Sequence, residues 1–321
     1  MIRRREVIAG LGSAAAWPLA ARAQTYPTRP VRLIVGFAPA GASDITARLI
    51  GQWLSERLGQ QFVIENRPGA GGNFATEAVA KAQPDGYTLL LTGPSDAWNP
   101  TLYGNLKFNY IRDIVPVASV SRSMAVLVVH PSVPARSVPE LIAYARANPG
   151  KLTIASAGIG SAQHMYWELF RSMSGVDMLH VPYRGAGAAL TDLVGGQVHA
   201  YFGALISSIQ YVGDGKLRAL AVTGSTRADV LPDIPTVGEF VTGYEASTWF
   251  GVGAPRNTPA EIVDMLNREI NAGLADPMMK ARFADLGAEV LAGSPADFGK
   301  FIADETEKWG KVVRFAGIRA E

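Results

Sequence analysis

Short apolar runs alternate along the chain with longer stretches in which apolar residues recur at helical spacing. Residues 31–38 (VRLIVGFA), 61–65 (QFVIE) and 87–92 (YTLLLT) have the pattern of buried strands. Residues 43–58 and 73–82 have helical patterns, and the first of these carries an apolar face of Ile45, Leu49, Ile50, Trp53, Leu54 and Leu58. Strands that alternate with helices predict an α/β fold on a parallel sheet with right-handed crossovers.

The middle and the end of the chain repeat this alternation. Strand patterns occur at residues 152–157, 178–183, 199–204 and 217–223, and helical patterns at residues 161–173 and 186–194. Three motifs place a serine or threonine three residues before an acidic residue, which predicts helix starts at Ser137–Glu140, Thr258–Glu261 and Ser294–Asp297. The last of these helices is expected to bury Phe298, Phe301, Ile302 and Trp309.

Two extended stretches interrupt the repeat, at residues 115–129 and 246–254. Neither fits a strand followed by a helix, so we interpret them as paired connections between two lobes. This predicts a first lobe of residues 24–122 plus 247–321 and a second lobe of residues 123–246. A single large sheet is the alternative.

The first 23 residues have the three parts of a secretory signal peptide. Arg3, Arg4 and Arg5 precede an apolar stretch at residues 7–20, and Ala21-Arg22-Ala23 predicts cleavage after Ala23. The arginine pair is also typical of twin-arginine signals, and an ordinary N-terminal helix is the alternative. No later stretch reaches 18 apolar residues, so we expect an exported, soluble protein of the periplasm.

Composition excludes several classes of protein. Apolar residues make up 48% of the 321 residues and charged residues 18%, which excludes disorder as the main state. The absence of cysteine excludes disulfides, zinc–cysteine sites, iron–sulfur clusters and thiol catalysis. The net charge of +2, or −1 once residues 1–23 are removed, does not indicate nucleic-acid binding.

Signatures of enzymes and metal sites are missing. The chain has no G-x-S-x-G, H-E-x-x-H or G-x-x-x-x-G-K-[ST] motif, and its four histidines lack metal-ligand spacing. We therefore expect no catalytic residues, cofactor or metal. An exported hydrolase that uses Ser161 with His164 is the enzymatic alternative, although no acid partner or oxyanion donor is evident.

The segment GFAPAGASD, residues 36–44, joins the first strand to the first helix. Its glycines allow close backbone approach, and Ser43 or Asp44 stands where an N-cap belongs. Free amide groups at a helix start can bind an anion. A tight turn whose aspartate only caps the helix is the alternative.

A second segment of this kind, SAGIGSAQH, covers residues 156–164. Gly158 and Gly160 resemble half of a dinucleotide fingerprint, but Gln163 stands at the third glycine position, which argues against it. We interpret the segment as a second anion site at a helix start, with helix packing as the alternative role for His164. Further side chains could lie at the same cleft, namely Ser95, Asp96, Trp98, Tyr183 and Arg184.

These segments together resemble the periplasmic solute receptors of tripartite tricarboxylate transporters, the Bug family. The resemblance rests on four segments in this order: VRLIVGFAPAGASDITARLI, QFVIENRPGAGGNFATEAVAKAQPDGYTLLL, SAGIGSAQHMYWELF and HVPYRGAGAALTDLVGGQVHAYF. It implies a two-lobed, type II-like periplasmic binding protein with two hinge strands. A small carboxylate would close in the cleft between the lobes and pass to integral membrane transporter subunits.

By position, the resemblance implies ligand contacts in both lobes. In the first lobe they are Phe37, Ala38, Pro39, Gly41, Ala42, Ser43, Asp44 and Ser95. In the second they are Ser156, Gly158, Ile159, Gly160, Ser161, His164, Tyr183, Arg184 and Gly203. A monomer without cofactor, metal or nucleic-acid partner is expected. A sensory receptor that presents the same ligand to a histidine kinase is the alternative.

One position departs from the family pattern. Many relatives carry an acidic residue where this chain has Gly203. Its absence favours a ligand without an amino group, namely a di- or tricarboxylate or an aromatic acid. Trp98, Tyr201 and Phe202 are then candidates for contacts to an aromatic or longer aliphatic body.

Overall fold

The computed structural model describes residues 26–39, 41–183 and 185–320. The predicted signal peptide and Arg184 lie outside the described residues. Three parallel strands form one half of the sheet in the order β2 (Phe62–Asn66), β1 (Val31–Val35) and β3 (Thr88–Thr92). Helices α1 (Ala42–Leu58) and α2 (Asn73–Ala80) connect them. The strands and helices predicted for this part are confirmed, with ends shifted by a few residues.

The second half of the sheet repeats this arrangement with β7 (Ala200–Ala204), β5 (Thr153–Ser156) and β6 (Leu179–Pro182), which are again parallel. The helices of this half are α5 (Val138–Ala147), α6 (Ala162–Ser174), α7 (Ala186–Val194) and α8 (Leu205–Gly213). Strand β8 (Arg218–Val222) pairs with β4 and completes the half-sheet. The strands predicted at residues 152–157, 178–183, 199–204 and 217–223 are confirmed.

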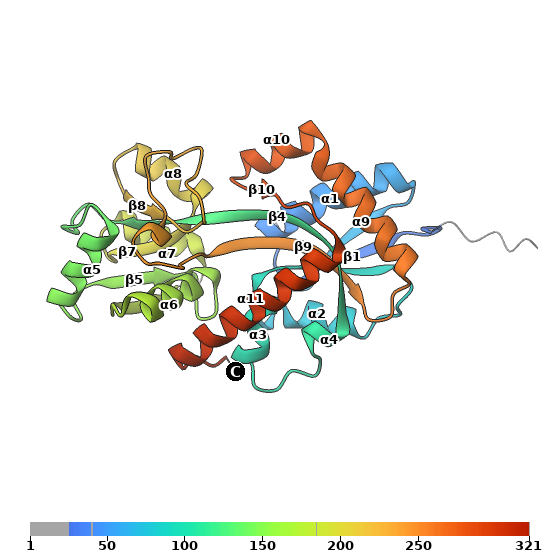
Figure 1. Cartoon of the computed structure of the whole chain (residues 1–321), viewed down its shortest axis with the longest axis horizontal. Coiled ribbons are helices and arrows are strands. Elements are labelled where there is room, and N and C mark those ends of the chain that lie inside the picture. The colour runs from blue at the N-terminus through green and yellow to red at the C-terminus, as the bar shows by residue number, and fades with distance from the viewer. Residues whose placement is uncertain (1–25, 40, 184, 321) are drawn as a thin grey trace, which may run out of the picture.

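Two long strands join the halves (Figure 1). These are β4 (Ile114–Val129) and β9 (Ser247–Pro255), which correspond to the two extended stretches of the sequence. The first part of β4, up to Met124, pairs with β9, whereas Ala125–Val129 pair with β7 and β8. The hydrogen-bonded sheet is therefore continuous, but two half-sheets with their own helices lie at its ends. A single sheet and two lobes were alternatives in the sequence. The structure combines them, because strand β4 pairs with strands of both half-sheets.

The C-terminal part of the chain returns to the first half. It contains α9 (Ala260–Ala275), α10 (Pro277–Asp285), the short β10 (Glu289–Val290) and α11 (Pro295–Ala316). The 22-residue helix α11 runs diagonally from the first half toward the second (Figure 1). It packs against α3 (Pro94–Leu102), against β4 and against α6, so it braces the two halves on one side.

Helix α3 was not predicted, because the two prolines in it, Pro94 and Pro100, usually indicate a turn or a loop. It forms because Pro94 occupies the first helical position and Asp96 caps the helix start. The Asp96 carboxylate accepts hydrogen bonds from the Gly93 amide (3.0 Å) and from the hydroxyls of Thr92 (2.8 Å) and Thr76 (2.6 Å). Burial raises the pKa of Asp96, and these three hydrogen bonds oppose that rise.

Two of the three predicted caps are confirmed. Ser137 accepts the amide of Glu140, and Ser294 forms a capping box with Asp297. The prediction at Thr258 is wrong, since its buried hydroxyl donates to the Pro255 carbonyl at 2.7 Å and Pro259 stands at the N-cap of α9. The described residues contain no helix that is both long and apolar enough to cross a membrane.

Candidate functional site

The parallel strands of both half-sheets end at one region of β4. Thr92, the last residue of β3, lies opposite Gly251 of β9, which in turn lies opposite Ser119 of β4. From the other side, Ala204 at the end of β7 lies opposite Ala125 of β4. The carboxyl ends of the two half-sheets therefore face each other across residues 119–125. In open α/β sheets, ligands bind outside the carboxyl ends of the strands. We call residues 119–125 of β4 and 247–250 of β9 the linker segment.

A cavity of about 200 Å³ connects the start of α1 to the linker segment. Its lining residues are Ala42, Ile45, Thr46, Ser121, Ser123, Phe250, Phe283, Leu286 and Ala288. Of these, only Ala42 was predicted as a ligand contact. The alternation of Ser121 and Ser123 within a largely apolar strand was the signal for these two serines, because residues at every second position share one face.

A second cavity of about 160 Å³ shares Ser123 and Ala288 with the first. It is bounded by Arg122 and Met124 of β4, by residues 224–230 except Arg227, and by Glu289 of β10. Arg122 lies 3.6 Å from a Glu245 carboxylate oxygen and 3.5 Å from one of Glu289. Its positive charge is thus partly offset by two carboxylates, one just before β9 and one on β10.

The loop from β1 to α1 presents backbone groups to solvent. Phe37, Ala38, Pro39, Gly41 and Ala42 are exposed. Gly36 is packed so closely that a methyl group there would lie 2.8 Å from the Gly72 Cα atom, so glycine is required. A methyl group at Gly72 would lie 3.6 Å from both the Ser95 hydroxyl oxygen and the Phe37 ring. The fold therefore brings two of the predicted residues, Phe37 and Ser95, close to Gly72.

The start of α1 differs from the prediction. Gly41 is the N-cap and has no side chain to cap the helix, and Ser43 and Asp44 lie inside the first turn rather than at the cap. Asp44 is 2% exposed and its carboxylate accepts hydrogen bonds from Arg48 and from the Asn66 side-chain amide. The amides of the first turn precede the first intrahelical bond, from Ile45 to Gly41, so they can serve an anion.

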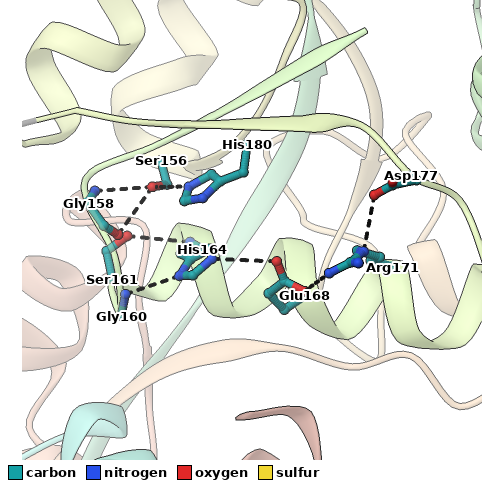
Figure 2. Close-up of polar contacts among 9 residues, drawn as sticks. All are labelled: Ser156, Gly158, Gly160, Ser161, His164, Glu168, Arg171, Asp177 and His180. Carbon is teal, nitrogen blue, oxygen red and sulfur yellow. Dashed lines mark hydrogen bonds and ion pairs between the residues drawn. The ribbon is translucent and has the colours of Figure 1, made fainter. Parts of the chain in front are cut away.

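The loop from β5 to α6 is held by its own side chains (Figure 2). Ile159 is 63% exposed, whereas Gly158, Gly160 and Ser161 are half-buried. Gly158 has φ +130° and Gly160 φ +75°, both in the region that favours glycine. Ser161 is the N-cap of α6 and accepts the His164 amide at 3.4 Å. This helix start therefore uses one of its amides internally, unlike α1.

Ser156 and His164 lie beneath this loop and not on it. Ser156 is 0% exposed, and its hydroxyl contacts both the amide and the carbonyl of Gly158. His164 is 2% exposed; its Nδ1 accepts the Gly160 amide and its Nε2 faces Glu168. Neither ring nitrogen is directed at the Ser161 hydroxyl, so the geometry does not support a serine–histidine hydrolase.

The remaining predicted residues lie around this loop. Tyr183 is half-buried and donates its hydroxyl to Asp192 at 2.8 Å; burial and this partner raise the pKa of the phenol to about 12. Its carbonyl oxygen lies 3.2 Å from where a methyl group at Gly158 would be. Gly203 is buried within β7, where an added methyl group would lie 2.3 Å from the Ser208 hydroxyl oxygen. An acidic side chain at position 203 would need that region to rearrange.

Three aromatic residues proposed to contact the ligand body lie in the core instead. Trp98 packs edge-on against Trp309 at 5.4 Å between ring centroids, and Phe202 packs against Phe170 and Tyr244. Tyr201 is 1% exposed. These interpretations were wrong because large aromatic residues next to a binding loop have the same sequence pattern as core residues.

No group of three or more His, Asp and Glu side chains among the described residues is arranged to hold a metal ion. This region offers mainly serine hydroxyls, backbone amides and apolar side chains. The hydroxyls and amides can orient an organic ligand through hydrogen bonds, and the apolar side chains can contact its body. A reversible binding site fits this composition.

Comparisons with known proteins agree with this description. Residues 46–318 match the family described as tripartite tricarboxylate transporter family receptor. Protein BugT of Bordetella pertussis is 39% identical over 302 residues, which cover 92% of each chain. The chain is also similar to a solved structure of the periplasmic binding protein BugD, with 35% identity and a TM-score of 0.77 over 92% of this chain and 100% of that one.

Two similar structures contain ligands. Rpa4515 of R. palustris, solved with adipate, is 40% identical with a TM-score of 0.80 over 92% of this chain and 99% of that one. MatC of Rhodopseudomonas palustris, solved with bound malate, is 33% identical. Its TM-score is 0.77 over 90% of this chain and 100% of that one. The family model and these likenesses extend over nearly the whole described fold. The chain therefore belongs to the tripartite tricarboxylate transporter receptor family, which includes the Bug proteins, and it has the two-lobed periplasmic binding-protein fold.

Proposed function

We propose that this protein captures a small organic carboxylate between its two lobes and delivers it to membrane subunits of a tripartite tricarboxylate transporter. The observation that carries the proposal is the convergence of both sets of parallel strands on the linker segment, where the start of α1 lines a cavity. A helix N-terminus offers about half a positive charge and unpaired amides, which suit a carboxylate that must later be released.

The proposed lobes are residues 24–122 with 247–321, and residues 123–246. The proposed ligand contacts are the exposed residues 37–39, 41 and 42 and the loop of residues 158–161, with Ser95 and Tyr183 near them. Arg184 stays a proposed contact from the sequence. The protein would be exported to the periplasm after cleavage behind Ala23 and would act as a monomer without catalysis. Relatives solved with adipate and with malate support a dicarboxylate as ligand.

A thermal-shift screen of residues 24–321 tests the ligand class. The panel comprises C4–C8 dicarboxylates, citrate, aromatic acids and acidic amino acids. A ligand at 100 times its dissociation constant is expected to stabilise the fold by about 2.7 kcal/mol. Adipamide, the uncharged diamide of adipate, is the control for a hit with adipate. The proposal would be contradicted if no carboxylate raised the melting temperature, or if adipamide raised it as much as adipate.

The variant Ala42→Asp tests the role of the α1 start. A negative charge in the first turn favours the helix by about 0.3–1 kcal/mol, so the melting temperature without ligand should not fall. Beside a bound carboxylate the same charge is repulsive, and we expect affinity to drop about tenfold, or about 1.4 kcal/mol. Isothermal titration of the ligand found in the screen gives the affinity. Ala42→Asn is the uncharged control. Equal affinities of the two variants for the ligand would show that the start of α1 is not part of the site.

A further inference from the structure

Two histidines are stacked under the β5–α6 loop. The rings of His164 and His180 lie 4.1 Å apart between centroids, with 7° between their planes. Figure 2 shows the His180 ring above the His164 ring, both beside Gly158 and Ser161, with hydrogen bonds from both rings leading to the loop. His164 is 2% exposed and His180 is half-buried. The buried His164 ring therefore supports the loop from inside the molecule.

The hydrogen bonds determine where the proton of His164 lies. The Gly160 amide donates to Nδ1 at 3.1 Å, so Nδ1 must be unprotonated. Nε2 lies 3.5 Å from the Glu168 carboxylate and therefore carries the proton of the neutral ring. A second proton could only go to Nδ1, where it would point at the Gly160 N–H and break that contact.

Charged groups on two elements surround the pair. Glu168 of α6 faces His164 directly and is also bound by Arg171, at 3.0 Å, which in turn contacts Asp177 at 3.2 Å. Burial raises the pKa of Glu168, but hydrogen bonds from His164 and Arg171 outweigh this and hold it below its usual range. Glu168 therefore stays ionised, and Arg171 already balances its charge.

His180 supports the same loop from the other side. Its Nε2 lies 2.7 Å from the Ser156 hydroxyl, which also accepts the Gly158 amide at 3.1 Å. Burial and the neighbouring His164 lower the pKa of His180 to about 4, against a smaller opposing effect of Glu168. His180 thus stays neutral, and the second loop contact persists.

We propose that His164 is a positioning residue, whose Nδ1 holds the Gly158–Ser161 loop in its binding shape by accepting the Gly160 amide. The proposal rests on the proposed function, because it concerns the same cleft. Loss of this acceptor releases the loop and weakens ligand binding, although the ring itself does not touch the ligand.

The affinity for adipate, used as the probe, tests the functional part. We expect His164→Leu to bind adipate about tenfold more weakly than wild type at pH 7.5, since the Gly160 amide loses its acceptor. Asparagine can place an oxygen where Nδ1 lies. His164→Asn should therefore restore most of the affinity that His164→Leu loses.

His130→Leu is the matched control, because His130 directly follows the far end of β4 and contacts Ser132. It should keep the wild-type affinity. Wild-type affinity in His164→Leu would overturn the proposal, as would an equal loss of affinity in His164→Asn and His164→Leu.

A measurement without ligand separates this inference from the proposed function. Nitrogen-15 spectra of the free protein should show His164 protonated only on Nε2 at pH 7.5. The amide signals of Gly158, Gly160 and Ser161 should shift in His164→Leu and stay close to their wild-type positions in His164→Asn. A proton on Nδ1 in the wild type, or loop amides that do not change in His164→Leu, would overturn the inference. If no carboxylate binds at pH 7.5, the proposed function fails, and these spectra still decide the role of His164.

Discussion

Replacing Trp309 by alanine is expected to lower the free energy of unfolding by about 3–5 kcal/mol, the range for truncating a buried aromatic residue. Trp309 is 0% exposed on α11 and lies between the two halves of the molecule. Its ring packs against Trp98 of α3 at 5.4 Å and against Tyr166 of α6 at 5.9 Å. The truncation therefore removes packing on both sides of the brace formed by α11.

A buried carboxylate adds to this effect. The Nε1 atom of Trp309 donates to Glu305 at 2.8 Å, and Trp249 of β9 donates to the same oxygen at 3.1 Å. Glu305 is 7% exposed and also pairs with Lys308. Loss of one donor leaves this carboxylate less well satisfied, which costs further free energy.

Urea unfolding followed by far-ultraviolet circular dichroism measures the change without depending on tryptophan fluorescence. Trp309→Phe is the matched control, because it keeps an aromatic ring but loses the N–H donor, and we expect it to cost less than half as much. Trp53→Ala provides a second comparison, since Trp53 of α1 is only half-buried against α9, where its Nε1 donates to the Glu269 carbonyl. A loss below about 1.5 kcal/mol for Trp309→Ala would contradict the role of α11 as a brace.

Replacing Gly158 by alanine is expected to reduce affinity for the carboxylate ligand by about ten- to a hundredfold. Gly158 has φ +130°, and its added methyl group would lie 3.2 Å from the Tyr183 carbonyl oxygen. Forcing alanine into this conformation costs about 1–3 kcal/mol. The loop can relieve this strain by giving up the contacts between Gly158 and Ser156, and each 1.4 kcal/mol needed to restore the binding shape is a factor of ten in affinity.

Gly150→Ala is the control for Gly158→Ala. Gly150 also has a positive φ, of +73°, and precedes β5 at the end opposite to the loop. A methyl group there meets no atom within 4 Å. It should lower stability by about 1–2 kcal/mol through backbone strain and leave affinity unchanged. Titration calorimetry and thermal melts of both variants separate the effects. Wild-type affinity in Gly158→Ala would show that this loop does not form the site.

Much of the architecture was predictable because its cause is local. The apolar run at residues 31–38 and the helical face after it correspond to β1 and α1, since strand and helix periods differ and each buries one face. The stretches at residues 115–129 and 246–254 were recognised as strands because they are long, apolar and without helical period, and they became β4 and β9. The boundaries proposed for the lobes stay a prediction.

The site was predictable only in part. Its two loops were found, because a glycine-rich turn between a strand and a helix leaves helix amides available. The serines of the linker segment and Phe250 were missed, since they become neighbours of α1 only after the half-sheets pair through β9 and β4.

The sequence by itself determined the order of strands and helices, the α/β class and the two loops at helix starts, because these depend on periodicity and on backbone freedom at glycine. Only the tertiary structure decided which side chain meets which. It placed Trp98 in the core beside Trp309 and the His164 ring between Gly160 and Glu168. It also directed the Thr258 hydroxyl toward the Pro255 carbonyl, to which it donates a hydrogen bond. A hydroxyl, an indole or an imidazole has several partners of similar local energy, and the packing of distant elements selects one of them.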